Sequence, residues 1–121
     1  MSDRPRAVAR GVLAAAMITV GVLHFVAEPF FVRIVPAWLP WPRALVWLSG
    51  AIEIALGAAA LPKRTRPLAR VGLVLLYVAV FPANLNMVVH PELGGGVPTW
   101  ALWARLPLQA LFIAWAWWSV R

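Results

Sequence analysis

Four apolar runs dominate this chain, at residues 7–27, 43–61, 68–89 and 99–120. A helix that crosses the ~30 Å hydrocarbon core of a bilayer needs about 20 such residues, and each run is long enough. Charged residues make up 12% of the chain, against roughly 25% in an ordinary soluble domain, so polar side chains are too few to cover a soluble globule. We therefore expect an all-α integral membrane four-helix bundle that forms one domain.

The basic residues predict how this bundle is oriented. With four spans, those before the first run, between the second and third, and at the chain's end all lie on one side. The positive-inside rule assigns that side to the cytoplasm, so we expect both termini there and a multi-pass location in the bacterial cytoplasmic (inner) membrane. These residues are Arg4, Arg6, Arg10, Lys63, Arg64, Arg66, Arg70 and Arg121, while Arg33, Arg43 and Arg105 fall toward the opposite side.

The residue types exclude several classes of function. A net charge of +7 could suggest nucleic acid, but the basic residues form short clusters and no stripe among stacking aromatics, so we expect no nucleic-acid partner. The chain has no cysteine and two histidines; thiolate chemistry is therefore excluded and no metal site is expected. No set of a nucleophile with its base is visible either. Any reaction would therefore have to use very few side chains, or a cofactor supplied from elsewhere.

The loops and tryptophans fit the membrane interpretation. We expect residues 28–42, with four prolines, to form an interfacial loop that cannot become another helix, and residues 90–98 to form a flexible Gly-rich turn. The tryptophans gather near both ends of the predicted spans, which is typical of the aromatic belts at the two membrane interfaces. A stacking platform for an aromatic ligand is the alternative for the outer group.

Glu53, within "WLSGAIEIALG", is the charge that lies deepest in the predicted membrane. Gly50 and Gly57 share its helix face, so we expect it at a close helix contact and not against lipid. A carboxylate at this depth has to be neutralised by a proton or paired with a cation. Arg105 in the last run is the cation we expect, although its long side chain could instead reach outward to the headgroups.

Each of the other runs also carries polar groups at a similar depth, so we predict one shared polar cluster in the outer half of the bundle. Its expected members are His24, Glu53, Tyr77, Asn84, Asn86, Arg105 and Gln109. Pro82 cannot donate a hydrogen bond to the Val78 carbonyl, which is then free for another partner. The simpler alternative is that the amides join helices, that His24 is structural, and that Glu28 and Arg33 are solvated loop charges.

With these residues identified, the chain resembles the DoxX-like family of small four-helix membrane proteins. The matching segments are "HF", "WLSGAIEIALG", "LPKRTRPLARVGL", "AVFPANLNM" and "RLPLQALFIAW", in that order. The resemblance implies a four-helix membrane bundle and a link to redox membranes, because relatives include a subunit of a thiosulfate:quinone oxidoreductase and partners of sulfurtransferase and superoxide dismutase. The family's polar positions correspond to His24, Glu53, Asn84 and Arg105, followed by Gln109.

Three functions remain open. In the first, the polar cluster binds a quinone or quinol, with Glu53 and His24 as catalytic proton carriers, the other cluster members as ligand-binding groups, and a protein partner that carries the redox centre. In the second, the chain is a non-enzymatic membrane anchor or assembly factor and Glu53–Arg105 is a permanent ion pair. In the third, homo-oligomers form a pathway for protons or small molecules.

Overall fold

The structure, a computed structural model, describes residues 3–121, and in this range the chain is all-helical and has no strand. Its elements are α1 (Arg4–Val26), α2 (Glu28–Ile34), α3 (Pro42–Ala59), α4 (Arg66–Val89), the 3-10 helix η1 (Pro91–Gly94) and α5 (Thr99–Ser119). The all-α prediction is confirmed. The four long helices begin and end within three residues of the ranges expected from the apolar runs.

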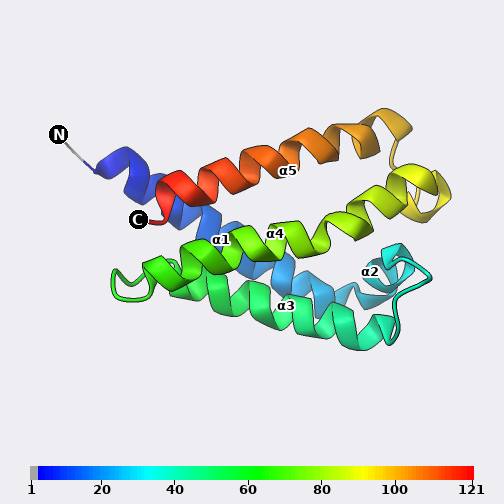
Figure 1. Cartoon of the computed structure of the whole chain (residues 1–121), viewed down its shortest axis with the longest axis horizontal. Helices are drawn as coiled ribbons and strands as arrows, with labels where there is room; N and C mark the ends of the chain where they lie inside the picture. Colours follow the sequence, from blue (N-terminus) through cyan, green and yellow to red (C-terminus); the bar gives the residue numbers. More distant parts are fainter. Residues whose placement is uncertain (1–2) are drawn as a thin grey trace.

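The four long helices run side by side along one axis (Figure 1). α1 packs most extensively against α3 and α5 against α4, and the pairs α3–α4 and α1–α5 complete the ring. Both chain ends and the α3–α4 connection lie at one end of the molecule, while α2 and η1 lie at the opposite end (Figure 1). Because the number of long helices is even, the N- and C-terminal segments lie at the same end of the molecule. We call this end the terminal end.

The expectation that proline keeps residues 28–42 from forming a helix was wrong for the first half of that segment. Glu28–Ile34 forms α2. Pro29 falls in the first helical turn, where its missing N–H leaves no bond unmade and its fixed φ suits the helix. Glu28 is not a solvated loop charge either, because its carboxylate lies 2.7 Å from Arg43 Nε and accepts a 3.1 Å bond from Trp47 Nε1. These contacts fasten α2 to α3.

The Gly-rich segment after α4 contains a short helix followed by a turn. η1 occupies Pro91–Gly94, and the chain then turns through Gly95 and Gly96, which have φ of 62° and 92°. Only glycine adopts these values without a steric cost. The turn returns the chain to the start of α5.

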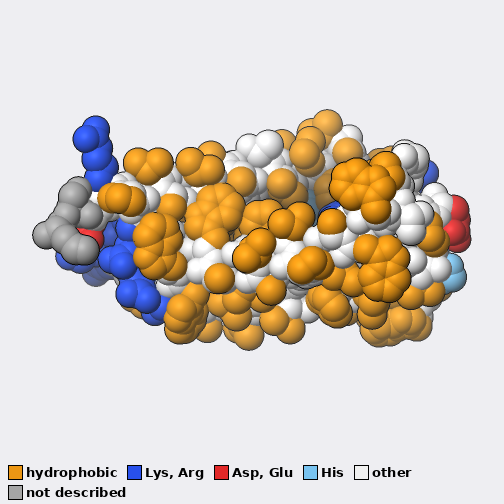
Figure 2. All heavy atoms as spheres, turned by 90° about the horizontal axis from the view of Figure 1, so that it is seen from above, with side chains coloured by type: hydrophobic (Ala, Val, Ile, Leu, Met, Phe, Trp, Pro, Cys, Tyr) orange, Lys and Arg blue, Asp and Glu red, His pale blue; other side chains and the backbone are white. Residues whose placement is uncertain are grey.

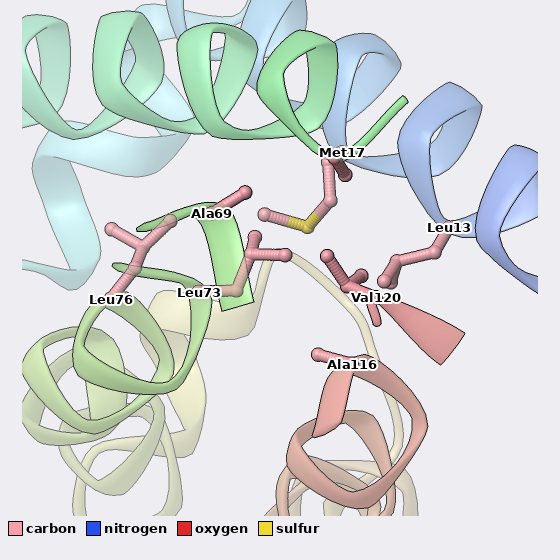
Figure 3. Packing of buried hydrophobic residues seen from close by; sticks show 8 residues of the cluster. Leu13, Met17, Ala69, Leu73, Leu76, Ala116 and Val120 are labelled. Carbon is pink, nitrogen blue, oxygen red and sulfur yellow. The ribbon is translucent and has the colours of Figure 1, made fainter. Parts of the chain in front are cut away.

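Two apolar clusters hold the helices together, one at each end. The larger cluster joins α1, α4 and α5 near the terminal end, where the side chains converge as Figure 3 shows. The smaller one joins α2, α4 and α5 at the opposite end. The members of the first are Leu13, Met17, Ala60, Ala69, Leu73, Leu76, Ala116 and Val120, and those of the second are Ile34, Met87, Val88 and Leu102.

By length and composition, α1 and α4 are each long and apolar enough to cross a membrane. α3 carries Arg43 and Glu53 among its 18 residues, and α5 carries Arg105, Gln109 and five tryptophans. The outer surface between the two ends is nonetheless largely hydrophobic on the face shown in Figure 2, and Lys and Arg gather at the terminal end.

Candidate functional site

A cavity of about 280 Å³ lies between the two apolar clusters. Six of the seven residues predicted to form the polar cluster line it: His24, Glu53, Tyr77, Asn84, Arg105 and Gln109. The rest of its wall is mostly apolar and comes from α1, α2, α4 and α5. The structure therefore brings side chains from four long helices, far apart in sequence, to one small space.

Glu53 reaches this cavity at the point where α1 and α3 approach most closely. A Cβ added to Gly21 would lie 2.8 Å from the Gly50 carbonyl oxygen, and one added to Gly50 would lie 2.6 Å from His24 Cβ. Because these glycines bring the two backbones together, the expectation that Glu53 lies on a face of close helix contact is confirmed. The Glu53 side chain is 12% exposed.

His24 is held in one orientation by three neighbours. Its Nδ1 lies 2.7 Å from the Val20 carbonyl oxygen, one turn earlier, and 3.4 Å from Glu53 Oε2. A carbonyl oxygen can only accept, so Nδ1 carries the hydrogen and Nε2 is the acceptor nitrogen of the neutral ring. The imidazole also stacks on Phe31, with ring centroids 4.1 Å apart. The pair of His24 and Glu53 thus presents acceptor atoms on the α1–α3 side of the cavity.

On the α4–α5 side, two amides form a fixed relay. Asn84 Nδ2 donates to Gln109 Oε1 at 2.8 Å, and Gln109 Nε2 donates to the Tyr77 carbonyl oxygen. The carbonyl predicted to be freed by Pro82 was that of Val78, so the observed acceptor lies one residue earlier in the same proline-disturbed turn. A side chain from a neighbouring helix supplies a bond to this turn, as expected near an intrahelical proline.

Tyr77 belongs to the floor of the cavity nearest the terminal end. Its hydroxyl lies 3.2 Å from Met17 Sδ, and its ring stacks on Phe112, which stacks on Trp115. Trp115 Nε1 donates to the Ala9 carbonyl at 3.0 Å and so ties α5 to α1. The floor is therefore largely aromatic.

Arg105 lines the cavity without a carboxylate partner among residues 3–121. Its Nη1 lies 3.6 Å from Met87 Sδ, a weak acceptor. The expected ion pair between Glu53 and Arg105 was wrong, because Glu53 pairs with His24 across the α1–α3 contact and Arg105 stays on the α5 side. The Arg105 side chain lines the cavity but does not pair with Glu53. Its guanidinium keeps donors for another acceptor.

Asn86 is the predicted member that does not line the cavity. Its Nδ2 donates to the Ile34 carbonyl at 3.0 Å and joins α4 to the end of α2. Asn84 and Asn86 are two residues apart, and residues at that spacing do not share a helix face. The spacing could have separated them before the structure was known.

Several lining residues were not anticipated from the sequence. Phe31 was missed because its segment was expected to be a loop, and Met17 and Trp115 were missed because apolar positions in an apolar chain carry little signal. The described residues contain no group of three His, Cys, Asp or Glu side chains near one another. The polar groups of the cavity include both donors and acceptors of hydrogen bonds.

The cavity opens at the side of the bundle. Val20 on α1 and Leu108 and Phe112 on α5 line it, and they are 39%, 44% and 40% exposed. A ligand could therefore reach the polar interior between α1 and α5 from the apolar outer surface. The fold and the site thus define a class of protein. It is an all-helical protein whose cavity opens at the side, with mostly apolar walls and a few polar groups.

The chain belongs to the family described as "Domain of unknown function (DUF8561)", which matches residues 13–120. This range includes every residue that lines the cavity. Comparison with curated proteins and with solved structures gave no match.

Proposed function

We propose that this chain is a multi-pass protein of the bacterial cytoplasmic membrane, a four-helix bundle with both termini in the cytoplasm. Its outer surface supports this. If α1 and α4 were core helices of a soluble protein, they would be mostly buried, whereas 33% and 17% of their apolar windows are buried within the molecule. A surface this apolar needs a lipid solvent. The DoxX-like resemblance of the sequence is part of the same proposal.

Within this bundle, the cavity binds the head group of a quinone or quinol. One observation carries the proposal. Arg105, a donor with no carboxylate partner in the described range, lines the same mostly apolar cavity as the acceptors Glu53 and His24, which lie on other helices. A quinone oxygen accepts from Arg105, and a quinol hydroxyl donates to His24 Nε2 or Glu53. The side opening suits an isoprenoid tail that remains in the lipid.

Glu53 and His24 are the groups that exchange protons in this proposal, since reduction of a quinone needs two protons as well as two electrons. The chain's own residues bind the head group and hold the protons, whereas the electrons come from a protein partner that carries the redox centre. The chain is then an accessory subunit and not a complete oxidoreductase.

The second candidate is a membrane anchor or assembly factor without a ligand. The relay from Asn84 through Gln109 to the Tyr77 carbonyl favours it, because these groups already satisfy one another and join α4 to α5. Under this alternative the polar residues fix the helix arrangement. The hydrogen bonds of the two amides therefore favour a role in helix packing, whereas the ligand proposal depends on Arg105, Glu53 and His24.

Titration of the purified chain in detergent with a short-tailed benzoquinone separates the two candidates. Trp115 lines the cavity, and its fluorescence should be quenched by a bound quinone. Loss of a hydrogen bond to a charged donor costs about 1.5–3 kcal/mol, so Arg105→Gln should weaken binding roughly tenfold or more. Glu53→Gln should keep the fold and block proton exchange, so that quinone turnover with the redox partner falls.

The matched control is Glu92→Gln, an equal change at an exposed carboxylate outside the cavity. It should leave quinone binding unchanged. Unsaturable quenching in the unmodified chain, or equal quenching in Arg105→Gln, would favour the anchor over the quinone site.

A further inference from the structure

Three arginines come together at the terminal end, away from the cavity. Arg6 and Arg10 lie on the first turns of α1, and Arg66 begins α4. Arg6 and Arg66 are both close enough to repel the charge of Arg10. Figure 2 shows Lys and Arg gathered at this end. We call Arg6, Arg10 and Arg66 the arginine cluster.

Arg10 is the unusual member because it is buried without a full set of partners. It is 7% exposed and shares its helix face with Leu13, Ala14 and Met17, which are core residues. Its Nη1 is buried and has no hydrogen-bond partner among residues 3–121, and the same is true of Arg6 Nε. A buried guanidinium that lacks an acceptor is costly, and nearby positive charges increase the cost.

The chain itself offers this cluster little negative charge. Asp3 lies 3.6 Å from Arg6 Nη1, and its side chain is 85% exposed. The Leu61 carbonyl accepts from Arg66 Nε and, at 2.7 Å, from Arg66 Nη2, and the backbone oxygen of Arg121 lies 3.4 Å from Arg66 Nη1. These acceptors leave an excess of positive charge beside Arg10. A ligand with several anionic oxygens would supply what is missing.

Arginine and phosphate are matched in shape and charge. The planar guanidinium donates two parallel bonds to a pair of phosphate oxygens, and several arginines can share one phosphate group. Tryptophan lies alongside, since the Arg6 guanidinium is 5.7 Å from the Trp118 ring centroid and Arg70 is 3.5 Å from that of Trp117. Indole rings next to arginine are typical of the headgroup level of a membrane.

We propose that the arginine cluster binds one anionic phosphate group between the start of α1 and the start of α4. In the membrane orientation proposed above, on which the lipid form of the ligand rests, this is the headgroup of an anionic phospholipid of the cytoplasmic leaflet. Arg10 holds the phosphate from inside the bundle, and Arg6 and Arg66 hold it from the rim. The site is independent of the quinone cavity.

Native mass spectrometry of the full chain in detergent tests the proposal with phosphatidylglycerol, phosphatidylcholine and inorganic phosphate as probes. We expect one phosphatidylglycerol to remain bound at least roughly fivefold more than phosphatidylcholine, which corresponds to the attraction of one basic residue for an anionic surface. Arg10→Gln and Arg6→Gln should each abolish this preference. Arg64→Gln, an exposed arginine at the same end, should preserve it.

Circular dichroism identifies any variant that fails to fold, and Arg6→Gln, at a half-buried position, keeps the test valid if Arg10→Gln is one. Inorganic phosphate that displaces the lipid, with the same dependence on Arg6 and Arg10, supports the site with free phosphate as its ligand. Equal retention of both lipids by the unmodified chain overturns the proposal. So does a loss in Arg64→Gln as large as in Arg6→Gln, because a general attraction of the basic end would then explain binding.

Discussion

At the scale of single residues, Gln109 is where helix packing and the cavity wall depend on each other. Its amide accepts from Asn84 and donates to the Tyr77 carbonyl. Gln109→Leu keeps the size of the side chain and removes both of these hydrogen bonds. Interhelical hydrogen bonds in membranes average ~0.6 kcal/mol each, so the variant should lose about 1 kcal/mol of stability. Unfolding in detergent, followed by circular dichroism, measures this loss.

Leu111→Met is the matched control on the same helix, at a position that is 64% exposed. It should unfold like the unmodified chain. A Gln109→Leu variant as stable as this control would mean that the relay contributes nothing to packing, and the anchor alternative would lose its main support.

At the same scale, the identity of the polar cluster could be predicted but its pairing could not. The depth of His24, Glu53, Asn84 and Arg105 along their helices follows from their positions in the sequence. Which carboxylate meets which cation depends on how far each helix is rotated. Glu53 pairs with His24 because the glycines of α1 and α3 bring those two helices close together.

At the scale of elements, the contact between α1 and α3 depends on Gly50. An alanine Cβ there would come within 2.6 Å of His24 Cβ and 2.9 Å of the Gly21 carbonyl oxygen. Overpacking of this kind costs about 1–3 kcal/mol, so Gly50→Ala should lower the free energy of unfolding by that amount. It should also displace His24 and weaken quinone binding.

Gly11 provides the opposite case on α1. A Cβ there would have nothing within 4 Å, and replacing glycine by alanine in a helix gains roughly 0.5–1 kcal/mol. Gly11→Ala should therefore stabilise the chain in the same unfolding assay. Destabilisation of both variants by similar amounts would contradict the close approach at Gly50.

The long helices were predicted correctly from the sequence, whereas the short helix α2 was not. The apolar runs were long enough to locate four helices with small errors at their ends. α2 was missed because the prolines of residues 28–42 were treated as helix breakers, whereas Pro29, the one proline in α2, lies at the helix start, where proline is favoured. Residue 31 was consequently lost from the predicted site, although its ring stacks on His24.

At the scale of the whole molecule, the proposed topology places the terminal end in the cytoplasm. The chain has no cysteine, so single cysteines can be introduced at Pro62, in the α3–α4 connection, and at Val97, in the loop before α5. Both residues are exposed. In intact cells, a membrane-impermeant maleimide should label Val97→Cys and spare Pro62→Cys, and detergent should make both reactive. The reverse pattern would invert the proposed orientation, and labelling of both would contradict a membrane-spanning bundle.

The central claim is that the cavity holds a quinone head group against Arg105, Glu53 and His24. Mass spectrometry of small molecules extracted from the chain, purified from its own membrane under mild conditions, tests this most directly. We predict a stoichiometric quinone that is lost in the Arg105→Ala and His24→Ala variants while the fold is retained. Recovery of bulk phospholipid alone would contradict it and leave the polar cluster as a means of fixing helix packing.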